Sequence, residues 1–360
     1  MPRLAPSPSL AVVLAAAMFA TAAVPLAAAP LDLGAVSADA KWLMHFDMDA
    51  ARDSIVVQRA WERMLKMHPH AGGMVDMASR MTGMDPRKDL RDATAYGRDT
   101  DKRNGVLIVR AKANREFLTR MVEKAADHKT MKHGDHTLHS WTHKHGRHSG
   151  PAVGAFFKDD VMVFGRTEAA VTAALDVLDG RKASVAGDAP LAGRVRPGSI
   201  VVARATAVDP DTKCPVLKQG EGFRVALGEH EGKSFYRARL EMESAAAADD
   251  VVNVVKGFTA LASLRWGGEA ETMKLVDGVK TVVEGDTCTI SWDAAAEDVW
   301  KVVDRAADEW EKRHRGRRGG GCPACGKDGC RGCEGCGKGE CPLMKGQKSE
   351  AEKPLRDDEF

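Results

Sequence analysis

The stretch that decides the fold is GVLIVRAKANREFLTRMVEKAAD, from Gly105 to Asp127. Its first nine residues, Gly105 to Ala113, are rich in β-branched and apolar side chains, which is typical of a strand. The remainder has the spacing of an amphipathic helix. Asn114 stands between the two parts, where its side chain can cap the first helical turn. The stretch therefore predicts a strand followed directly by a helix.

The same order of elements occurs a second time. KSFYRARLEMES (Lys233 to Ser244) is followed by the Ala-rich AAAADDVVNVVKGFTALASL. Further along each half, DDVMVFGRTEAAVTAALDVL aligns with GDTCTISWDAAAEDVWKVVDRA at nearly the same offset. Because strand, short polar stretch and helix recur in one order, we expect a tandem pseudo-repeat of two halves, over residues 31–183 and 195–313.

The fold class follows from how the strands are connected. Strands outnumber helices, and several are joined by tight turns such as Lys158-Asp159-Asp160 rather than by helical crossovers. The expected class is α+β, with mostly antiparallel sheets covered on one face by helices. This pattern resembles a loose class of uncharacterised secreted bacterial proteins built from two α+β halves. The resemblance covers Leu31 to about Arg313 and implies no activity.

The beginning of the first half has its own pattern. AKWLMHFDMD (Ala40 to Asp49) alternates in the manner of a half-buried strand. AARDSIVVQRAWERMLKM follows as one amphipathic helix. Further on, Met64, Met67, Met74, Met77, Met81 and Met84 crowd one segment with His68 and His70. Thioethers select Cu(I), but spacings of three, four and seven also suit a buried helix face, and we expect these methionines to pack in the core.

The first thirty residues predict a targeting segment. Arg3 is the only charge before Asp32, and an apolar, Ala-rich run from Leu10 to Ala29 follows it. Small residues at its end suit cleavage, which makes residues 1–29 a signal peptide. The alternative is an uncleaved N-terminal anchor, since the run is long enough to span a bilayer. Either way the body is expected outside the cytoplasm, periplasmic or secreted, with no transmembrane segment after cleavage.

Charge and motifs exclude several classes of function. The chain carries 53 Lys and Arg against 51 Asp and Glu, a net charge of +2, so nothing favours nucleic acid or an anionic membrane as the partner. The sequence contains no G-x-S-x-G elbow, H-E-x-x-H pair, P-loop, or G-x-G-x-x-G after a strand. No enzyme is predicted.

Cysteines dominate the end of the chain. After a basic, glycine-rich linker over residues 314–321, CPACGKDGCRGCEGCGKGEC (322–341) holds six thiols with almost no apolar side chain between them. A hydrophobic core cannot order such a segment, so a metal or disulfides must do so, or it stays disordered. CPACG and CEGCG resemble the knuckles of zinc ribbons and rubredoxins. The resemblance implies a tetrahedral site made by Cys322, Cys325, Cys333 and Cys336.

Two uses of these thiols stay open. All six could share two ions in a metallothionein-like cluster, with Zn as the first candidate and Cu as the alternative: Cys322, Cys325, Cys330, Cys333, Cys336 and Cys341. An oxidising compartment favours disulfides instead. Cys214 and Cys288 lie apart from the cluster, and they either pair or remain two buried thiols. Residues 342–360 are charged and predict a disordered tail.

A second metal candidate lies in the His-rich stretch HKTMKHGDHTLHSWTHKHGRHSG (128–150). Gly134-Asp135 suits a two-residue hairpin loop, which places His133 opposite His136. Period two puts His139, His143 and His145 on one strand face. Imidazoles at such spacing suit Zn, Cu or Ni, whereas a solvated hairpin with adventitious binding, or a pH-sensitive basic patch, is the alternative.

The sequence thus predicts an extracytoplasmic, non-enzymatic binding protein that chelates a divalent metal through its Cys-rich segment. The partner beyond a metal ion is an unknown protein or cell-surface component. One alternative is a secreted structural or interaction protein whose tail is disulfide-bonded. Another is metal binding by the His-rich hairpin.

Overall fold

The computed structural model describes residues 31–99, 101, 103–145, 148–185, 191–208, 212 and 215–318. The predicted signal peptide, Cys214 and the Cys-rich segment lie outside these residues. In the described ranges no helix is long and apolar enough to cross a membrane. The contacts divide the chain into one unit that ends at Trp300 and another that begins at Lys301.

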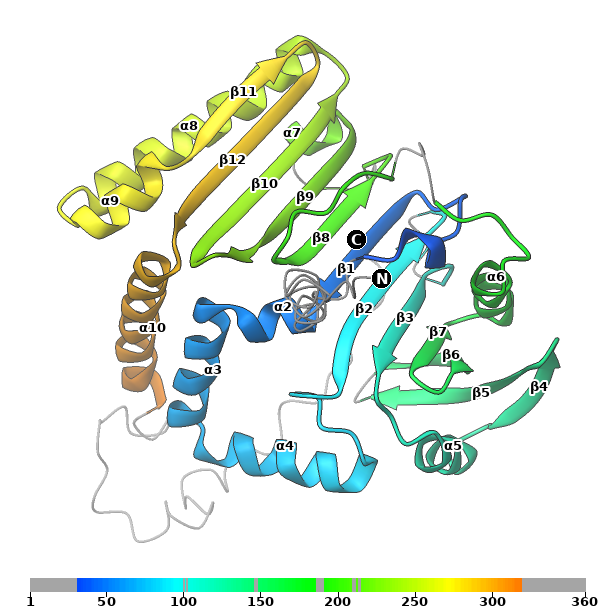
Figure 1. The fold of residues 1–360 in the computed structure, drawn as a ribbon. Helices are drawn as coiled ribbons and strands as arrows, with labels where there is room; N and C mark the ends of the chain where they lie inside the picture. Colours follow the sequence, from blue (N-terminus) through cyan, green and yellow to red (C-terminus); the bar gives the residue numbers. More distant parts are fainter. Residues whose placement is uncertain are drawn as a thin grey trace, which may run out of the picture. The chain divides into compact units, whose positions relative to one another are not determined.

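The first unit contains an antiparallel sheet of twelve strands, in the order β11-β12-β10-β9-β8-β1-β2-β3-β7-β6-β5-β4 (Figure 1). The strands are β1 (Trp42–Asp47), β2 (Leu90–Gly97), β3 (Val106–Ala111), β4 (Lys129–His133), β5 (His136–His145), β6 (His148–Lys158), β7 (Val161–Gly165), β8 (Ser199–Ala205), β9 (Gly220–His230), β10 (Lys233–Met242), β11 (Lys280–Glu284) and β12 (Thr287–Ala295).

Helices connect several of these strands. They are η1 (Leu33–Ala35, a 3-10 turn), α2 (Met48–Asp53), α3 (Ile55–Met67), α4 (Pro69–Thr82), α5 (Arg115–Glu123), α6 (Glu168–Leu178), α7 (Pro215–Lys218), α8 (Ala245–Trp266), α9 (Ala270–Asp277) and α10 (Ala296–Arg318). The predicted α+β class, with mostly antiparallel pairing, is confirmed.

The strand order agrees with a duplicated plan. In each half the third strand, β3 or β10, is followed by a helix and pairs with the last strand of that half, β7 or β12. The first strands, β1 and β8, pair with each other in antiparallel fashion. The halves therefore share one sheet rather than forming a sheet each. The pairing of β1 with β8 provides hydrogen-bond partners for two strand edges that would otherwise be unpaired.

The strand and helix predicted over residues 105–127 are present. β3 runs from Val106 to Ala111, and the Asn114 side chain accepts a hydrogen bond of 2.9 Å from the Phe117 amide at the start of α5. The helix ends at Glu123, before the expected Asp127, which adopts a left-handed φ of 59°. The single helix predicted after β1 is two helices, because Ser54 is extended and caps α3.

The main core lies between α6 and the first half of the sheet. Val171 and Leu175 of α6 are fully buried against Ile108, Leu138 and Val163. Burying a side chain of this size stabilises the fold by about 1.5–3 kcal/mol. We call this side of the sheet the α6 face. It also carries η1 and the segment from Leu191 to Arg196, whose backbone carbonyls accept hydrogen bonds from the buried Arg204.

The other side of the sheet, the α5 face, carries helices as well. Alternate residues of β5 to β7, namely His139, Gly154 and Phe164, contact α5 on the side away from Leu138. In the second half, α8 packs on β10 to β12 through Ala248 and Val252. Following the cross-strand register places α8 on this same α5 face. Helices therefore lie on both faces of the first half, not only on one.

Candidate functional site

The middle of the α5 face is an apolar strip. The register aligns Phe46 with Ala93 on one side and Val201 on the other, and Met44 with Ala95 and Ala203. Cross-strand partners point to the same face, so the strip continues into β3 and β9. We define it by its members on five neighbouring strands: Met44, Phe46, Ala93, Ala95, Leu107, Val109, Val201, Ala203, Val225 and Leu227.

Four members of the strip are open to solvent. Met44 is 39% exposed, Phe46 41%, Leu107 39% and Leu227 39%. An antiparallel sheet with one solvated face normally alternates apolar residues toward the core with polar residues toward water. Here the face toward water is apolar. Contiguous exposed apolar surface, unlike single exposed apolar side chains, is typical of interaction and ligand-binding sites.

The covered face of the same strands is the more polar one. His45, Asp47 and Asp92 are buried, at 1%, 3% and 0% exposure. The His45 imidazole Nδ1 lies 2.8 Å from the Thr94 hydroxyl, and Arg110 donates to Asp92 over 3.2 Å. Burial raises the pKa of Asp92 despite this cation. β1 and β2 thus turn several polar side chains toward the interior, while apolar side chains such as Met44 and Phe46 face water.

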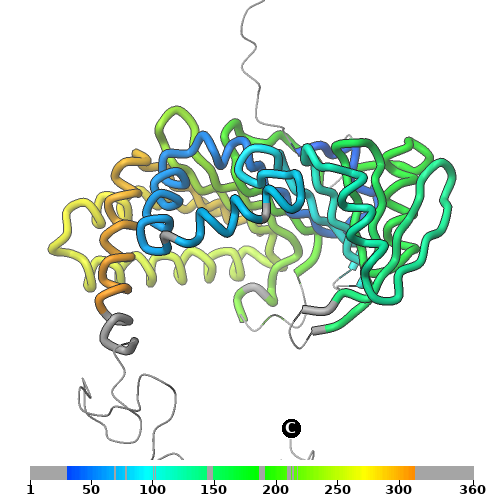
Figure 2. Tube along the Cα trace, turned by 90° about the horizontal axis from the view of Figure 1, so that it is seen from below, coloured from blue at the N-terminus to red at the C-terminus, as the bar shows by residue number. Residues whose placement is uncertain are grey.

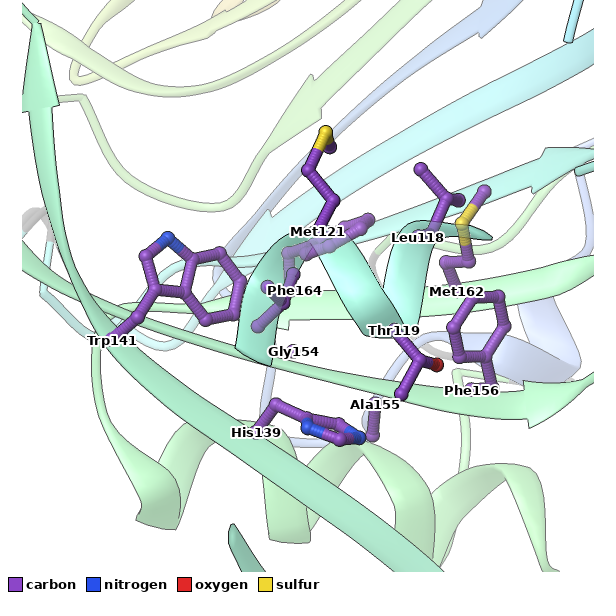
Figure 3. Close-up of a pocket in the computed structure, with 11 residues that line it drawn as sticks. Leu118, Thr119, Met121, His139, Trp141, Gly154, Ala155, Phe156, Met162 and Phe164 are labelled. Atoms are coloured by element: carbon purple, nitrogen blue, oxygen red, sulfur yellow. The ribbon is translucent and has the colours of Figure 1, made fainter. Parts of the chain in front are cut away.

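A pocket adjoins the strip under α5. It encloses about 200 Å³ and is lined almost entirely by apolar side chains. Figure 3 shows the side chains of α5 among those of the strands. The lining residues are Leu118, Thr119, Met121 and Val122 of α5, with His139, Trp141, Gly154, Ala155, Phe156, Met162 and Phe164 of β5 to β7.

The pocket and the strip form one apolar surface. Phe164 of the pocket pairs in register with Leu107 of the strip, and Met162 pairs with Val109. Gly154 leaves space at the base of the pocket, where a Cβ would lie only 3.0 Å from Phe164 Cδ1 and 3.2 Å from Trp141 Cη2. An elongated apolar molecule could therefore extend from the open strip into the space under α5.

His139 lines this pocket and lies next to a second histidine, His128. The Nε2 atom of His128 lies 3.1 Å from Nδ1 of His139, and the rings stack with centroids 5.4 Å apart. Burial, and then the neighbouring His128, lower the pKa of His139. The lowered pKa favours the neutral form of the His139 imidazole, which lines an otherwise apolar pocket.

The predicted His hairpin forms, but its histidines are divided between the two faces. His133 and His136 pair in register across the turn, where Gly134 has a φ of 57°. Each ring contacts a different carboxylate at the C-terminal end of α6: His133 lies 2.7 Å from Asp176 in the helix, and His136 lies 2.9 Å from Asp179, the residue after it.

Arginine completes that cluster. Arg181 donates to Asp176 over 2.8 Å and to Asp179 over 2.6 Å. The hydrogen bond from His133, with those from Arg181 and Lys182, holds the pKa of Asp176 well below its usual range. The carboxylates are thus already paired with cations.

His139 points to the α5 face, and period two places His143 of β5 on that same face. The side chain of His145 lies outside the part of the chain that the structure describes. The structure therefore brings His133 and His136 together and separates them from His139 and His143. Across the described ranges, no group of three or more His, Cys, Asp or Glu is arranged to hold a metal. The six cysteines of 322–341 lie outside those ranges.

A second cavity of about 430 Å³ lies among α2, α3 and α4. Trp61 and Val75 line it, together with Met48 at the start of α2. The turn that holds Pro86 and Arg87 completes its lining, and because Arg52 and Arg87 are charged, the cavity is less uniformly apolar than the pocket under α5.

Comparison with known proteins identifies no relative by sequence. No protein-family model matches the chain, and no curated protein matches it. Among solved structures, crystal form III of TP0453 is similar, with a TM-score of 0.39 and 10% identity over 76% of this chain and 97% of that one. Crystal form I of TP0453 gives 0.38 and 12% over 77% and 98%. Similarity at this level does not establish a shared function.

Proposed function

We propose that this protein is a non-enzymatic binding protein that acts outside the cytoplasm and holds an elongated apolar ligand on its α5 face. The observation that carries the proposal is the apolar strip, whose exposed members lead in register into the pocket under α5. A long-chain fatty acyl group has the matching chemistry, because it is narrow, flexible and apolar along its length.

The exposed area of four side chains in the strip sets the size of the free energy that ligand binding can gain. Full burial of a Leu, Met or Phe side chain stabilises by about 1.5–3 kcal/mol, and about two fifths of each of four side chains is still available. A ligand that covers the strip thus gains roughly 2–5 kcal/mol from these residues alone. Contacts within the pocket add to this, and ordering of the ligand opposes it.

The direct test is titration of the full chain with a fluorescent long-chain fatty acid whose emission responds to an apolar environment. Phe46→Lys places an ammonium group in the middle of the strip, where a bound chain would have to desolvate it. We expect the probe to bind about tenfold or more weakly to this variant.

Phe258→Lys is the matched control. Phe258 is 69% exposed on α8, outside the strip, so the same charge is added to a comparable residue elsewhere. Equal affinity of both variants and the unmodified chain, or a wild-type chain that binds no probe, contradicts the proposal.

Metal chelation by the Cys-rich segment is a second candidate function, because two Cys-x-x-Cys-Gly knuckles lie in a segment with almost no apolar residues with which to fold. Elemental analysis of reduced full-length protein against a chain ended at Arg318 tests it. Equal, substoichiometric metal in both rejects it. Metal that is retained after truncation and lost on replacement of His136 and His139 would instead place the site in the His-rich hairpin. Mass spectrometry without reductant detects the disulfide-bonded alternative through the loss of hydrogen at each bridge.

A further inference from the structure

The methionines of α4 do not pack in the core. Met74 is 66% exposed, Met77 59% and Met81 60%, so the expectation of a buried Met face is wrong for this helix. α3 and α4 follow β1 and α2 as consecutive helices, in blue to cyan in Figure 2. Val75 is the residue of α4 that lines the cavity of about 430 Å³. The inner side of α4 is therefore the side that carries Val75, and it forms one wall of this cavity.

The cavity is large enough for a small molecule, and most of its wall is apolar. Its volume lies within the range of about 300–1,000 Å³ that is usual for ligand sites. Val57 and Trp61 are four residues apart on α3, so they lie on one side of that helix, and both line the cavity. Met48 and Pro86 add further apolar surface. The Trp61 indole gives the cavity an aromatic wall.

Two guanidinium groups line the same cavity, and their N–H groups already have partners within the protein. Arg52 donates to the backbone carbonyl of Arg87 and to the Asp49 carboxylate. Arg87 donates to Asp85 over 2.8 Å and to Asp76 over 2.6 Å. Because a guanidinium donates in its own plane, these bonds leave its flat face as the part that can contact a guest molecule.

This arrangement does not suit an anionic ligand. The positive charges are balanced by Asp49, Asp76 and Asp85, so a carboxylate or phosphate would have to displace a partner that is already in place. A guanidinium face instead attracts the electron-rich face of an aromatic ring. An aromatic ring also stacks favourably on an indole. The lining thus favours an aromatic guest over a charged or a saturated one.

We propose that the cavity among α2, α3 and α4 binds a planar, uncharged aromatic molecule, which lies against Trp61 and the flat faces of Arg52 and Arg87. The interaction is non-covalent, and no electron or proton is transferred. The site is separate from the apolar strip and takes a different class of ligand. It therefore goes beyond the proposed function and does not depend on whether an acyl chain binds to the strip.

The test compares the binding of β-naphthol to the full chain with that of decahydro-β-naphthol, its saturated counterpart. Both molecules are uncharged near neutral pH, carry one hydroxyl and have the same carbon skeleton, but only β-naphthol is planar and aromatic. Two cation–π contacts correspond to roughly tenfold or more in affinity, and β-naphthol should bind more tightly by about that factor. Equal affinity for the two molecules overturns the proposal, as does tighter binding of the saturated one.

Methyl NMR locates the bound ring. The ring current of an aromatic guest moves the signals of methyl groups next to it, so the signals of Met48, Val57 and Val75 should shift together and saturate at one equivalent of β-naphthol. Shifts confined to strip residues such as Leu107 and Leu227 overturn the proposal, and so does the absence of any shift.

Trp61→Leu removes the aromatic wall and keeps an apolar residue with good helix propensity. It should weaken β-naphthol binding by about three- to tenfold and leave the affinity for decahydro-β-naphthol unchanged. Trp266→Leu is the matched control, because Trp266 is 39% exposed on a different helix, α8, and this variant should bind both molecules as the unmodified chain does.

Val75→Phe tests the same cavity from α4. The larger side chain takes up space in the cavity and should weaken both molecules, whereas Trp61→Leu should weaken only the aromatic one. An equal loss of β-naphthol affinity in Trp266→Leu overturns the proposal, as does unchanged affinity in both Trp61→Leu and Val75→Phe.

Discussion

The attachment of α3 to the sheet depends on one carboxylate. Glu229, on β9, accepts hydrogen bonds from the Ser54 hydroxyl at 2.8 Å and from the amides of Ile55 and Val56 at 2.8 and 3.3 Å. Those amides are among the groups that a helix N-terminus leaves without intrahelical partners, and the helix dipole favours a negative charge there. α3 buries none of its residues. We therefore predict that Glu229→Ala releases α3 and α4 locally.

The size of the effect follows from these contacts. A hydrogen bond to a charged group contributes about 1.5–3 kcal/mol, but the site is only partly buried and water can replace some of the bonds. A net loss of about 2–3 kcal/mol is expected. The exposed pair between Arg59 and Glu297 remains, and such a pair contributes at most about 1 kcal/mol. Since 1.4 kcal/mol is tenfold, amide exchange should accelerate by about 30- to 150-fold.

Hydrogen exchange followed by mass spectrometry measures this directly. Peptides from residues 55–82 should exchange faster in Glu229→Ala, and peptides from β5 to β7 should not change. Glu229→Gln keeps a hydrogen-bond acceptor but removes the charge. Its exchange rates in residues 55–82 should lie between those of Glu229→Ala and those of the unmodified chain. Glu221→Ala changes an exposed residue of the same strand and should match the unmodified chain. Uniformly faster exchange over the whole sheet, or no change in 55–82, would refute the reasoning.

Three further predictions concern titratable groups. Burial, and then the neighbouring His128, lower the pKa of His139, so the unfolded chain binds a proton at this residue more readily than the folded chain does. The free energy of unfolding should therefore fall as the pH drops below 6.5. In urea titrations His139→Gln should reduce this pH dependence, and an unchanged dependence would contradict the prediction. The pKa of Asp176 is depressed, first by the hydrogen bond from His133, so its contribution exists above the unfolded pKa and declines in acid. Asp176→Asn should cost about 1.5–3 kcal/mol at pH 7 and less at pH 3, and equal losses would argue against this ion cluster. Burial raises the pKa of the Cys288 thiol, so reduced native protein should resist alkylation there until urea is added, as peptide mass spectrometry can show. Labelling at the same rate in both states would disprove that burial protects the thiol.

Local patterns could be predicted where neighbouring residues decide the outcome. Asn114 marks the start of α5 because its side chain bonds to an amide three residues on. The Gly134-Asp135 turn sets His133 opposite His136 because only the turn geometry is needed. The alternation in WLMHFD (Trp42 to Asp47) does not by itself predict the apolar strip. Alternation alone would bury Met44 and Phe46, whereas the structure buries Leu43 and His45.

The sequence by itself determined the α+β class, the strand β3 with the helix α5 that follows it, and the hairpin that carries the histidines, since these follow from local periodicity, caps and turns. Only the tertiary structure decided that β1 and β8 join the halves into one sheet, that the apolar side of β1 faces water, and that the methionines of α4 are exposed. Periodicity defines two faces of an element, but which face is covered depends on where distant segments such as α6 and residues 191–196 pack.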